Sequence, residues 1–567
     1  MKRRLAAALL VLATALPAAE PPRASLGTGG AVAVEEETAA RVGLDILRQG
    51  GNATDAAVAI AFALAVTWPE AGNLGGGGFW ISRDARGRVL AIDFRETAPR
   101  RARSDLFREA TGGGPPPSST EGPLASGVPG SVAGLALAHR RAGRLPWKTV
   151  VAPAVRLARD GFPMTANISG SIAAHRDDLA KDPETAHIFL PGGAAPEPGT
   201  VFRQPELSRT LAAIRDRGED GFYRGETARA IEEGQRRIGG LISRGDLGRY
   251  TARIRQPLSF RFAGAQVFTT AAPSSGPVLA EMALAAERVG RERFRSMDAA
   301  AAHLLAEIEK RAFRDRNRWL GDPDFPGVNQ KLFTDPARIA RLVASIDRAR
   351  AMPSADLARV FPERSSTTHF SVVDGEGTVV AVTTTLNDSF GNARVAQGLG
   401  FLMNNEMDDF ATRPGEKNLY GLIQGEVNSV APGKRMLSSM CPTIAVVPRR
   451  GVFAFGTPGG STILTTNFQV LLGLVLRGET LEAAVGAPRF HQQDFPDVLE
   501  VEQDAFDPAW IAALEAMGHA VKVSTRDPVP GRIGRVHAVG VLRSGRTEAV
   551  ADPRRGGAAL VVRPDGR

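Results

Sequence analysis

The hydrophobic pattern near the start of the chain predicts two consecutive helices. Residues 38–49 have helical periodicity and are followed by Gly50-Gly51, a common end for a helix. A second stretch, from Thr54 to Pro69, contains AAVAIAFALAV and is hydrophobic on every side, which predicts a buried helix. After the glycines of residues 75–78, the segments FWIS and VLAIDF have the apolar or alternating character of strands.

The second half of the chain is dominated by predicted strand pairs. Residues 368–386 consist of THFSVVD, the turn GEG and TVVAVTTTL, a pattern that predicts a hairpin. A second hairpin is expected from residues 443–447 and 452–455. It is followed by GTPGGS and by an apolar helix from Thr462 to about Leu476, for which Ser461 is the expected N-cap.

Three further segments complete the expected organisation. Residues 297–320 have helical periodicity, with Arg and Glu on one side. Residues 111–123 and 352–366 are expected to be exposed connections because Gly, Pro, Ser and Arg dominate them. Alternating strand pairs and long buried helices favour an α/β fold of layered sheets covered by helices, and the chain has no internal repeat.

Composition narrows the class of protein. With 567 residues, 43% of them hydrophobic, the chain can bury a large core, which favours an enzyme over a small binding module. The 70 Lys and Arg against 61 Asp and Glu give only +9, almost all of it arginine and without long like-charged runs. Nucleic acid is therefore not an expected partner. Cys441 is the single cysteine, which excludes an intramolecular disulfide, a thiolate zinc cluster and an iron–sulfur cluster.

Residues 1–19, MKRRLAAALLVLATALPAA, have the form of a secretory signal peptide: basic residues, an apolar run and small residues near its end. The run is shorter than the roughly 20 apolar residues that span a membrane. No later segment is long and apolar enough to do so. We therefore expect a periplasmic or secreted protein with no membrane anchor after removal of the signal, whose cleavage point the sequence leaves open.

Several common catalytic motifs do not occur. There is no H-E-x-x-H and no close pair of histidines, so a zincin-type metal site is unsupported. The glycine runs fit neither G-x-G-x-x-G nor a phosphate loop, and G-x-S-x-G is missing. Nucleotide binding and ordinary serine hydrolysis both become less favoured.

Three short stretches contain the residue types of an acyl-transfer site: residues 365–370, residues 404–410, and residues 438–440 ahead of Gly459-Gly460. Each has an ordinary explanation when taken alone. Thr-Thr at the start of a strand reflects β-propensity, acidic pairs are usually solvated turns, and Ser-Ser and Gly-Gly are usually loops.

Together with other motifs, these stretches match a known family in order along the chain. The matching motifs are GGNATDAAVAIAFALAVTWPEAGNLGGGGF (51–79), DFRETAP (93–99), SGVPGSVAG (126–134), TTHFSVVD (367–374), LNDSFG (386–391), MNNEMDDF (403–410), GKRMLSSMCPTI (433–444), GTPGGS (456–461) and APRFH (487–491). They resemble the γ-glutamyltranspeptidases, members of the N-terminal-nucleophile hydrolase superfamily. The resemblance implies a four-layer αββα sandwich in which two subunits are intertwined.

The resemblance also implies that the precursor cleaves itself between Ser366 and Thr367. The products would be a large subunit of residues 20–366 and a small catalytic subunit of residues 367–567, which stay together as a heterodimer. Thr367 becomes the nucleophile, and its freed α-amino group, with an intrinsic pKa of about 7.7–8.0, can accept the hydroxyl proton near neutral pH. An amide nitrogen inside a chain cannot do this.

The remaining family residues are carried over in the same way. Thr385 supports the nucleophile, and the backbone N–H groups of Gly459 and Gly460 form the oxyanion hole, at the positive end of the helix that follows. In the family, the substrate's α-carboxylate is bound by residues that match Arg95, Ser438 and Ser439. Its α-ammonium group is bound by residues that match Asn387, Glu406 and Asp409. The lid tyrosine of the family matches Tyr420. A guanidinium opposite carboxylates suits a zwitterionic head group.

Three positions are notable in this comparison. Cys441 stands where many relatives have serine, and we expect it to be buried and not a nucleophile. His369 lies on the same face of its predicted strand as Thr367, so spacing leaves a catalytic role open, although a structural one is favoured. Glu406 replaces the glutamine of some relatives and should bind an ammonium group more strongly.

The expected function is an exported, self-processing γ-glutamyltransferase and glutathione hydrolase. It would pass the γ-glutamyl group of glutathione or related compounds to water, amino acids or peptides, with no metal or organic cofactor. One alternative is a cephalosporin or glutaryl acylase of the same superfamily, which does not need an α-ammonium site. Another is a non-catalytic periplasmic amino-acid-binding protein, which predicts an uncut chain.

Overall fold

The computed structural model describes residues 23–108, 116–354, 366–413, 415–416, 418–526 and 529–563. The expected signal peptide lies outside the described residues, as do part of the 111–123 loop and most of the 352–366 connection. Among the helices of the described residues, none has the length and apolar character needed to cross a membrane.

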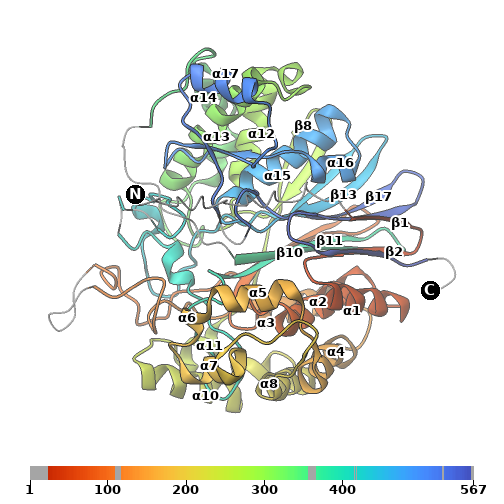
Figure 1. The fold of residues 1–567 in the computed structure, drawn as a ribbon, viewed down its shortest axis with the longest axis vertical. Coiled ribbons are helices and arrows are strands. Elements are labelled where there is room, and N and C mark those ends of the chain that lie inside the picture. The colour runs from red at the N-terminus through yellow and green to blue at the C-terminus, as the bar shows by residue number, and fades with distance from the viewer. Residues whose placement is uncertain are drawn as a thin grey trace, which may run out of the picture.

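Two seven-stranded sheets form the centre of the molecule (Figure 1). Neighbouring strands within each are antiparallel. In order across the first sheet they are β1 (Arg23–Gly27), β18 (Thr547–Ala551), β17 (His537–Leu542), β13 (Gly451–Gly456), β12 (Thr443–Val447), β9 (Ala265–Thr269) and β8 (Leu258–Phe262). The second sheet contains β19 (Ala558–Val561), β2 (Gly30–Val34), β10 (Ser366–Asp374), β11 (Val379–Asn387), β3 (Gly77–Arg83), β4 (Val89–Asp93) and β7 (Arg253–Arg255).

Helices cover the outer face of each sheet (Figure 1). Outside the second sheet are α1 (Glu37–Arg48), α2 (Ala53–Thr67), α3 (Ser131–Ala142), α4 (Trp147–Asp160), α5 (Ala166–Ala174), α6 (Arg176–Leu179), α7 (Pro183–Phe189), α8 (Pro205–Arg217), α9 (Asp220–Tyr223), α10 (Gly225–Ile238) and α11 (Arg244–Arg249). Outside the first are α12 (Gly276–Gly290), α13 (Ala299–Trp319), α14 (Pro336–Ala344), α15 (Thr462–Leu472), α16 (Leu481–Gly486) and α17 (Pro508–Ala516). Short strands also occur at β5 (Phe162–Pro163), β6 (Val201–Phe202), β14 (Phe490–His491), β15 (Leu499–Val501) and β16 (Val521–Val523).

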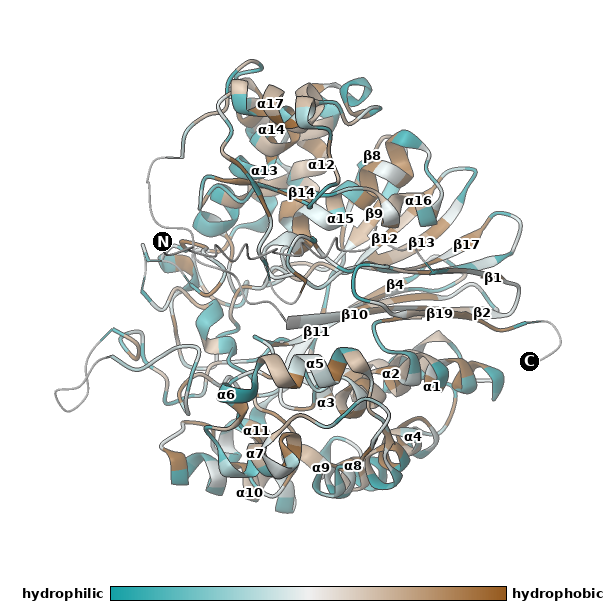
Figure 2. Cartoon of the chain, in the orientation of Figure 1, coloured by the Kyte–Doolittle hydropathy of each residue, from teal (hydrophilic) through white to brown (hydrophobic). Residues whose placement is uncertain are grey.

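Hydrophobic side chains fill the spaces between these four layers. One buried cluster joins α1, α2 and α4 to the second sheet, and another joins α12, α13 and α15 to the first. Between the two sheets the buried residues are mostly alanine and valine, such as Ala33, Ala381 and Ala454. Figure 2 shows the corresponding hydrophobic colouring along the strands and the hydrophilic turns at the periphery. The layered architecture predicted from the sequence is confirmed.

Local sequence accounts for the elements that carry the site. Both predicted hairpins form, as β10–β11 and β12–β13. The predicted all-apolar helix is α2, and every residue in it is buried. Its start is fixed by Asn52 and Asp55, which accept hydrogen bonds from each other's backbone N–H at 3.0 Å.

One detail of the prediction is wrong. Ser461 occupies the position before α15, but its side chain makes no capping hydrogen bond; its hydroxyl instead contacts Gln493 and Arg526. The helix predicted over residues 297–320 forms as α13, and several of its charged residues are buried: Glu307, Glu309, Lys310, Arg311 and Arg316. Surrounding segments provide their partners: for example, Lys310 binds Asp497 at 2.6 Å. The helix predicted from Thr462 to about Leu476 forms: α15 runs to Leu472 and continues as a π-helical turn over Gly473–Arg477.

Candidate active site

The β10–β11 hairpin brings Thr367 and Thr385 together. The two residues are direct partners across the strands, and their hydroxyl oxygens are 3.3 Å apart. Both are buried. The register of the hairpin shifts between Ser366 and Thr367, so the ladder is irregular at the expected cleavage point. The pairing of the two strands that carry these threonines, predicted from the hairpin pattern, is confirmed.

Glycines 76–78 allow another segment to approach this hairpin closely. A Cβ atom at Gly76 would lie 2.1 Å from the carbonyl oxygen of Thr385, and one at Gly78 would lie 2.3 Å from that of Thr383. Asn73 donates a hydrogen bond of 3.0 Å to the same Thr385 carbonyl. The glycine run and Asn73 therefore fix the backbone beneath the threonine pair.

The Gly459-Gly460 turn lies at the N-terminus of α15. Gly459 has φ +134° and Gly460 φ +55°, and a Cβ atom on Gly459 would lie 2.3 Å from the Thr462 hydroxyl oxygen. The loop starts at Gly456, where an added Cβ would lie 2.4 Å from the ring of His369. Since His369 follows Thr367 by two positions on β10, this contact packs the start of the glycine loop against the strand that carries Thr367.

His369 is held by hydroxyl groups other than that of Thr367. Its Nδ1 lies 2.8 Å from the Thr383 hydroxyl and its Nε2 lies 3.0 Å from the Ser371 hydroxyl. Burial, with a contribution from His537, lowers its pKa well below the ordinary value, so the ring is neutral. Both nitrogens are engaged in hydrogen bonds, which favours the structural role.

A cluster of buried charges surrounds Arg95, which follows β4. Its Nη1 lies 2.6 Å from Glu406 Oε2 and 3.5 Å from Glu96 Oε2, and its Nη2 pairs with Asp409. Burial raises the pKa values of Glu406 and Asp409 even though Arg95 opposes the shift. Burial likewise raises the pKa of Glu96 to about 7. The cluster thus holds one cation among three carboxyl groups that are reluctant to ionise together.

Ser438 and Ser439 lie beside this cluster. Arg95 donates to the carbonyl groups of Met436 and Leu437, at 3.3 and 3.4 Å, in the turn that precedes the two serines. The Ser439 hydroxyl accepts a hydrogen bond of 3.1 Å from Arg316. The structure therefore brings Arg95 and both serines into one region.

Arg316 is a residue that the sequence pattern did not single out. It projects from α13, is fully buried, and also donates to the Ser275 hydroxyl at 2.9 Å. Burial lowers its pKa to about 10, which leaves it charged at neutral pH. Its position in an amphipathic-looking helix gave no signal of this placement.

Asn387 and Tyr420 close another side of the cluster. The Tyr420 hydroxyl lies 2.7 Å from both the carbonyl oxygen and the Oδ1 of Asn387. Burial, together with nearby Asp409 and Glu406, raises the pKa of Tyr420 well above its usual value, so the phenol stays protonated and donates. Gln493 donates to the Tyr420 carbonyl at 2.9 Å and holds this loop in place.

Arg535 is the second residue that sequence patterns missed. Its Nη2 donates to the carbonyl oxygen of Thr367 at 3.3 Å, and its Nε lies 2.7 Å from Glu35 Oε1. No motif contains it, and the contact joins positions 168 residues apart.

Cys441 is buried, as expected. Its Sγ accepts a hydrogen bond from Asn467 at 3.2 Å, and burial raises the pKa of the thiol to about 12. A protonated, inaccessible thiol does not compete with Thr367 as a nucleophile.

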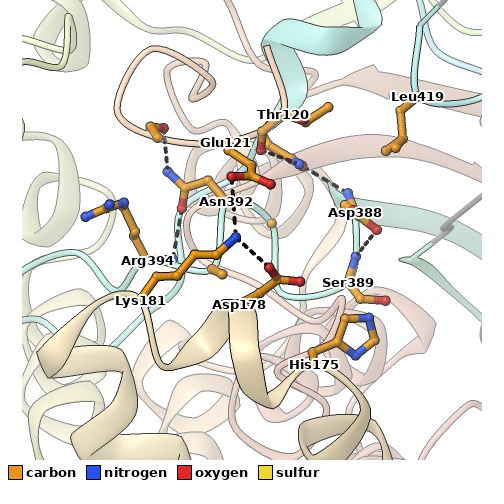
Figure 3. A pocket seen from close by; sticks show the side chains of 14 residues that line it. Thr120, Glu121, His175, Asp178, Lys181, Asp388, Ser389, Asn392, Arg394 and Leu419 are labelled. Carbon is orange, nitrogen blue, oxygen red and sulfur yellow. Dashed lines mark hydrogen bonds and ion pairs between the residues drawn. The ribbon is translucent and has the colours of Figure 1, made fainter. Parts of the chain in front are cut away.

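A polar cavity of about 370 Å³ adjoins the cluster (Figure 3). Its lining includes Asp388, Asn405 and Leu419, the chain neighbours of Asn387, Glu406 and Tyr420. Within it, Lys181 binds Asp178 at 2.8 Å and Glu121 at 3.4 Å (Figure 3). Thr367 is not among the lining residues, so this cavity borders the candidate site without containing the expected nucleophile.

Comparisons with known proteins agree with this geometry. A family model described as gamma-glutamyltranspeptidase matches residues 39–562. A glutathione hydrolase proenzyme of Escherichia coli is 41% identical over 530 residues, covering 93% of this chain and 90% of the relative. One of Pseudomonas aeruginosa is 39% identical over 543 residues, covering 94% and 95%.

Two solved structures are similar as well. The cephalosporin acylase of Bacillus halodurans has a TM-score of 0.84 over 97% of this chain and 99% of that chain, at 24% identity, which speaks to the fold alone. A gamma-glutamyltranspeptidase chain of Pseudomonas nitroreducens has a TM-score of 0.53 and 39% identity, and covers 57% of this chain and 96% of its own length.

Proposed function

The chain belongs to the gamma-glutamyltranspeptidase family, and from that premise we propose that Thr367 is its catalytic nucleophile. The protein is an enzyme, a γ-glutamyltransferase and glutathione hydrolase, with the αββα fold of the N-terminal-nucleophile hydrolases. Its relatives are named proenzymes, and it acts on glutathione and other γ-glutamyl compounds. The residue roles below form the proposal.

Maturation consists of cleavage between Ser366 and Thr367, giving residues 20–366 and 367–567. The Thr367 hydroxyl attacks the Ser366 carbonyl, and the acyl group moves from nitrogen to oxygen. Water then hydrolyses the ester, which frees both the α-amine and the hydroxyl. In support, the solved P. nitroreducens chain is matched along almost its full length yet covers 57% of this chain, as a separate large fragment would.

The two fragments remain joined because both sheets use strands from each. In the second sheet, β10 and β11 of the small fragment pair with β2 and β3 of the large one. In the first sheet, β18 pairs with β1, and β12 pairs with β9. The small fragment's β19 also pairs with β2, so separating the fragments would break five strand pairings and expose the intervening core. A heterodimer is therefore the stable product.

Turnover follows from the freed threonine. The α-amine takes the hydroxyl proton as Thr367 attacks the γ-carbonyl of the donor, with the Thr385 hydroxyl supporting the nucleophile at 3.3 Å. The backbone N–H groups of Gly459 and Gly460 bind the developing oxyanion at the positive end of α15. The proton then passes to the leaving amine. Water or the amine of an amino acid or peptide attacks the γ-glutamyl ester and restores Thr367.

The charged cluster binds the head group of the donor. Arg95, with Ser438 and Ser439, holds the α-carboxylate, while Glu406, Asp409 and Asn387 hold the α-ammonium. Because Arg95 pairs with Glu406 and Asp409 in this structure, an incoming zwitterion exchanges these contacts for two new ion pairs and leaves no buried charge uncompensated. The Arg316 guanidinium adds positive charge beside Ser439.

Tyr420 acts as a lid residue through its contact with Asn387, and a closed lid excludes water from the acyl-enzyme. The chemistry requires no metal or organic cofactor. The signal-like residues 1–19 support export to the periplasm or the medium, where extracellular γ-glutamyl compounds are the available donors.

The observation that carries the proposal is the buried Thr367–Thr385 hydroxyl pair on a site whose other end combines a guanidinium with carboxylates. The test compares two anilides that differ only in the α-ammonium group, γ-glutamyl anilide and glutaryl anilide. We expect kcat/KM for the γ-glutamyl compound to be higher by at least about 100-fold, because buried carboxylates left without their cation are costly. Preference for the glutaryl compound would instead identify a glutaryl-type acylase. An uncut chain that turns over neither would identify a binding protein.

A further inference from the structure

A buried ion pair between Glu35 and Arg535 lies against the nucleophile. Glu35 directly follows β2, and Arg535 lies just before β17. Their side chains are 1% and 7% exposed, with Arg535 Nε 2.7 Å from Glu35 Oε1. The same guanidinium donates to the Thr367 carbonyl at 3.3 Å, and the backbone N–H of Arg535 donates to the Thr457 hydroxyl at 2.7 Å. Arg535 thus links the end of β2 and the start of β10 through its side chain, and the loop that leads to Gly459 through its backbone N–H.

The position of this contact follows from where β2 ends. The pairing of β2 with β10 runs from Gly30 opposite Asp374 to Val34 opposite Phe370. The chain then turns away, and α1 begins at Glu37. The residues of β10 that precede Phe370, including Thr367, therefore have no partner residue on β2. Arg535 supplies a hydrogen-bond donor to Thr367 where the neighbouring strand no longer can.

The guanidinium also places a positive charge near the atom that becomes the general base. After cleavage the α-amine and the carbonyl of Thr367 are attached to the same Cα, so these atoms lie within about 4 Å of each other. The Arg535 guanidinium, 3.3 Å from that carbonyl, is therefore within roughly 7 Å of the amine. A like charge at this distance disfavours the protonated amine, and the Glu35 carboxylate moderates the effect.

Within the described part of the chain, the strands beside β10 add few charges near Thr367. The sequences of β2, β11 and β13, which neighbour β10, contain no ionisable side chain. From β17, His537 lies 3.9 Å from Glu35, and burial lowers its pKa; His369 on β10 itself is neutral for the same reason. The acidic residues Asp55 and Asp374 lie at the opposite end of the β10 strand, where Asp374 accepts from the start of α2.

A second ion pair lies nearby. Burial alone would raise the pKa of Glu70, but Arg555, and to a smaller extent Arg535, bring it down to about 2. Glu70 is therefore ionised, and it binds Arg555 through both carboxylate oxygens at 2.8 and 2.7 Å. This pair is neutral overall, whereas Arg535, paired with Glu35, contacts the Thr367 main chain directly.

We propose that Arg535, held by Glu35, is a positioning residue that fixes the main chain of Thr367 and keeps its freed α-amino group unprotonated near neutral pH. The inference rests on the proposed function, in which that amine is the general base. It predicts that removing either partner changes the pH at which turnover begins, and that the two changes have opposite signs.

The test measures kcat for γ-glutamyl anilide at saturating concentration against pH, using fully cleaved enzyme. Below neutral pH, kcat rises as the α-amine loses its proton, and this rise is the acidic limb of the profile. Removing the cation in Arg535→Gln should raise the pKa of the amine, and so move the acidic limb to higher pH by about one unit, because the ammonium form is no longer destabilised by a neighbouring positive charge. Removing the anion in Glu35→Gln should move it down. Arg535→Lys should lie between wild type and Arg535→Gln. The matched control is another buried pair, Glu307 with Arg311 on α13, whose Gln variants should leave the limb in place.

A purely structural role would lower kcat at every pH without moving the limb, and that result would overturn the inference. So would a shift of the same sign in Glu35→Gln and Arg535→Gln. If Arg535→Gln does not cleave itself, the test uses Glu35→Gln and Arg535→Lys, which both retain a cation. The inference then predicts that the acidic limb of Glu35→Gln lies at a lower pH than that of wild type, and the limb of Arg535→Lys at a higher pH. Failure of the wild type to cleave or to turn over the γ-glutamyl anilide would instead contradict the proposed function itself.

Discussion

The two ends of the candidate site use different physical means. At the head-group end, Arg95, Glu96, Glu406 and Asp409 are buried ions or carboxyl groups in direct contact. At the proposed nucleophile end, two threonine hydroxyl groups meet, and the proposed oxyanion donors are glycine N–H groups and the proposed general base an amine that cleavage creates. In this proposal, recognition depends on charge, whereas chemistry depends on position. Substitutions in the charged cluster should therefore change KM, and substitutions around Thr367 should change kcat or self-cleavage.

The largest effect is expected at the nucleophile. Thr367→Ala removes the attacking hydroxyl, so the chain should stay uncut and turnover of γ-glutamyl anilide should fall by at least about 10⁴-fold. Thr367→Ser, which keeps a hydroxyl, should still cleave. Denaturing gels and anilide kinetics measure both properties. An active Thr367→Ala protein would refute the assignment of the nucleophile.

The next largest effect is expected at the Gly459-Gly460 turn, the proposed oxyanion hole. In Gly459→Ala the new Cβ meets the Thr462 hydroxyl and the φ of +134° becomes unfavourable, so the N–H groups should be displaced. We expect kcat to fall by about 10²- to 10³-fold with little change in KM. The control is Gly478→Ala, which also has a positive φ but no close neighbour. Equal effects in both variants would mean that backbone strain alone is responsible.

Arg95→Lys should change KM and leave kcat largely unaffected. Lysine keeps the charge but cannot contact Glu406, Asp409 and a substrate carboxylate in the geometry of a guanidinium. The chain should cleave normally, and KM for the donor should rise by about 10- to 100-fold, the value of a lost charge-assisted hydrogen bond. Arg255→Lys, in an ion-pair network with Asp93 and Asp324, serves as the control. An unchanged KM would remove Arg95 from the binding site.

The smallest effect is a pH dependence of KM. Burial raises the pKa of Glu96 to about 7, and it raises those of Glu406 and Asp409 as well. The donor's ammonium favours ionised carboxylates, so binding must expel a proton at lower pH, and KM should fall as pH rises from 6 to 8, by about fivefold. Glu96→Gln removes one of the competing acids and should flatten this dependence. A KM that rises with pH would contradict the interpretation.

The sequence pattern predicts the layers and hairpins because these depend on local periodicity. The β10–β11 pair follows from two alternating segments around a glycine turn, and α2 follows from an unbroken apolar stretch. Contacts between residues far apart in the sequence, which form only when helices and sheets pack together, could not be predicted from local patterns. Arg316 reaches Ser439, 123 positions away, and nothing in the pattern of α13 distinguishes a buried guanidinium from a solvated one.

Most of the assigned site residues came from the family resemblance, and their roles remain proposals. The structure adds that Arg95, Glu406 and Asp409 contact one another and that Thr367 pairs with Thr385. The expected cap at Ser461 did not form because its hydroxyl has tertiary partners: it donates to Gln493, and its oxygen accepts a hydrogen bond from Arg526 in place of a helix N–H. Local propensity identifies a residue that can cap a helix, but the fold decides where its hydrogen bond goes.

The central claim is that Thr367 is exposed as a new N-terminus and then performs the chemistry. The most direct measurement is N-terminal sequencing of the smaller band from freshly purified protein on a denaturing gel. The account predicts a fragment that begins Thr367-Thr368-His369, in equal amount with the larger fragment. A chain that stays intact under native conditions while turning over γ-glutamyl anilide, or a fragment beginning at another residue, would contradict it.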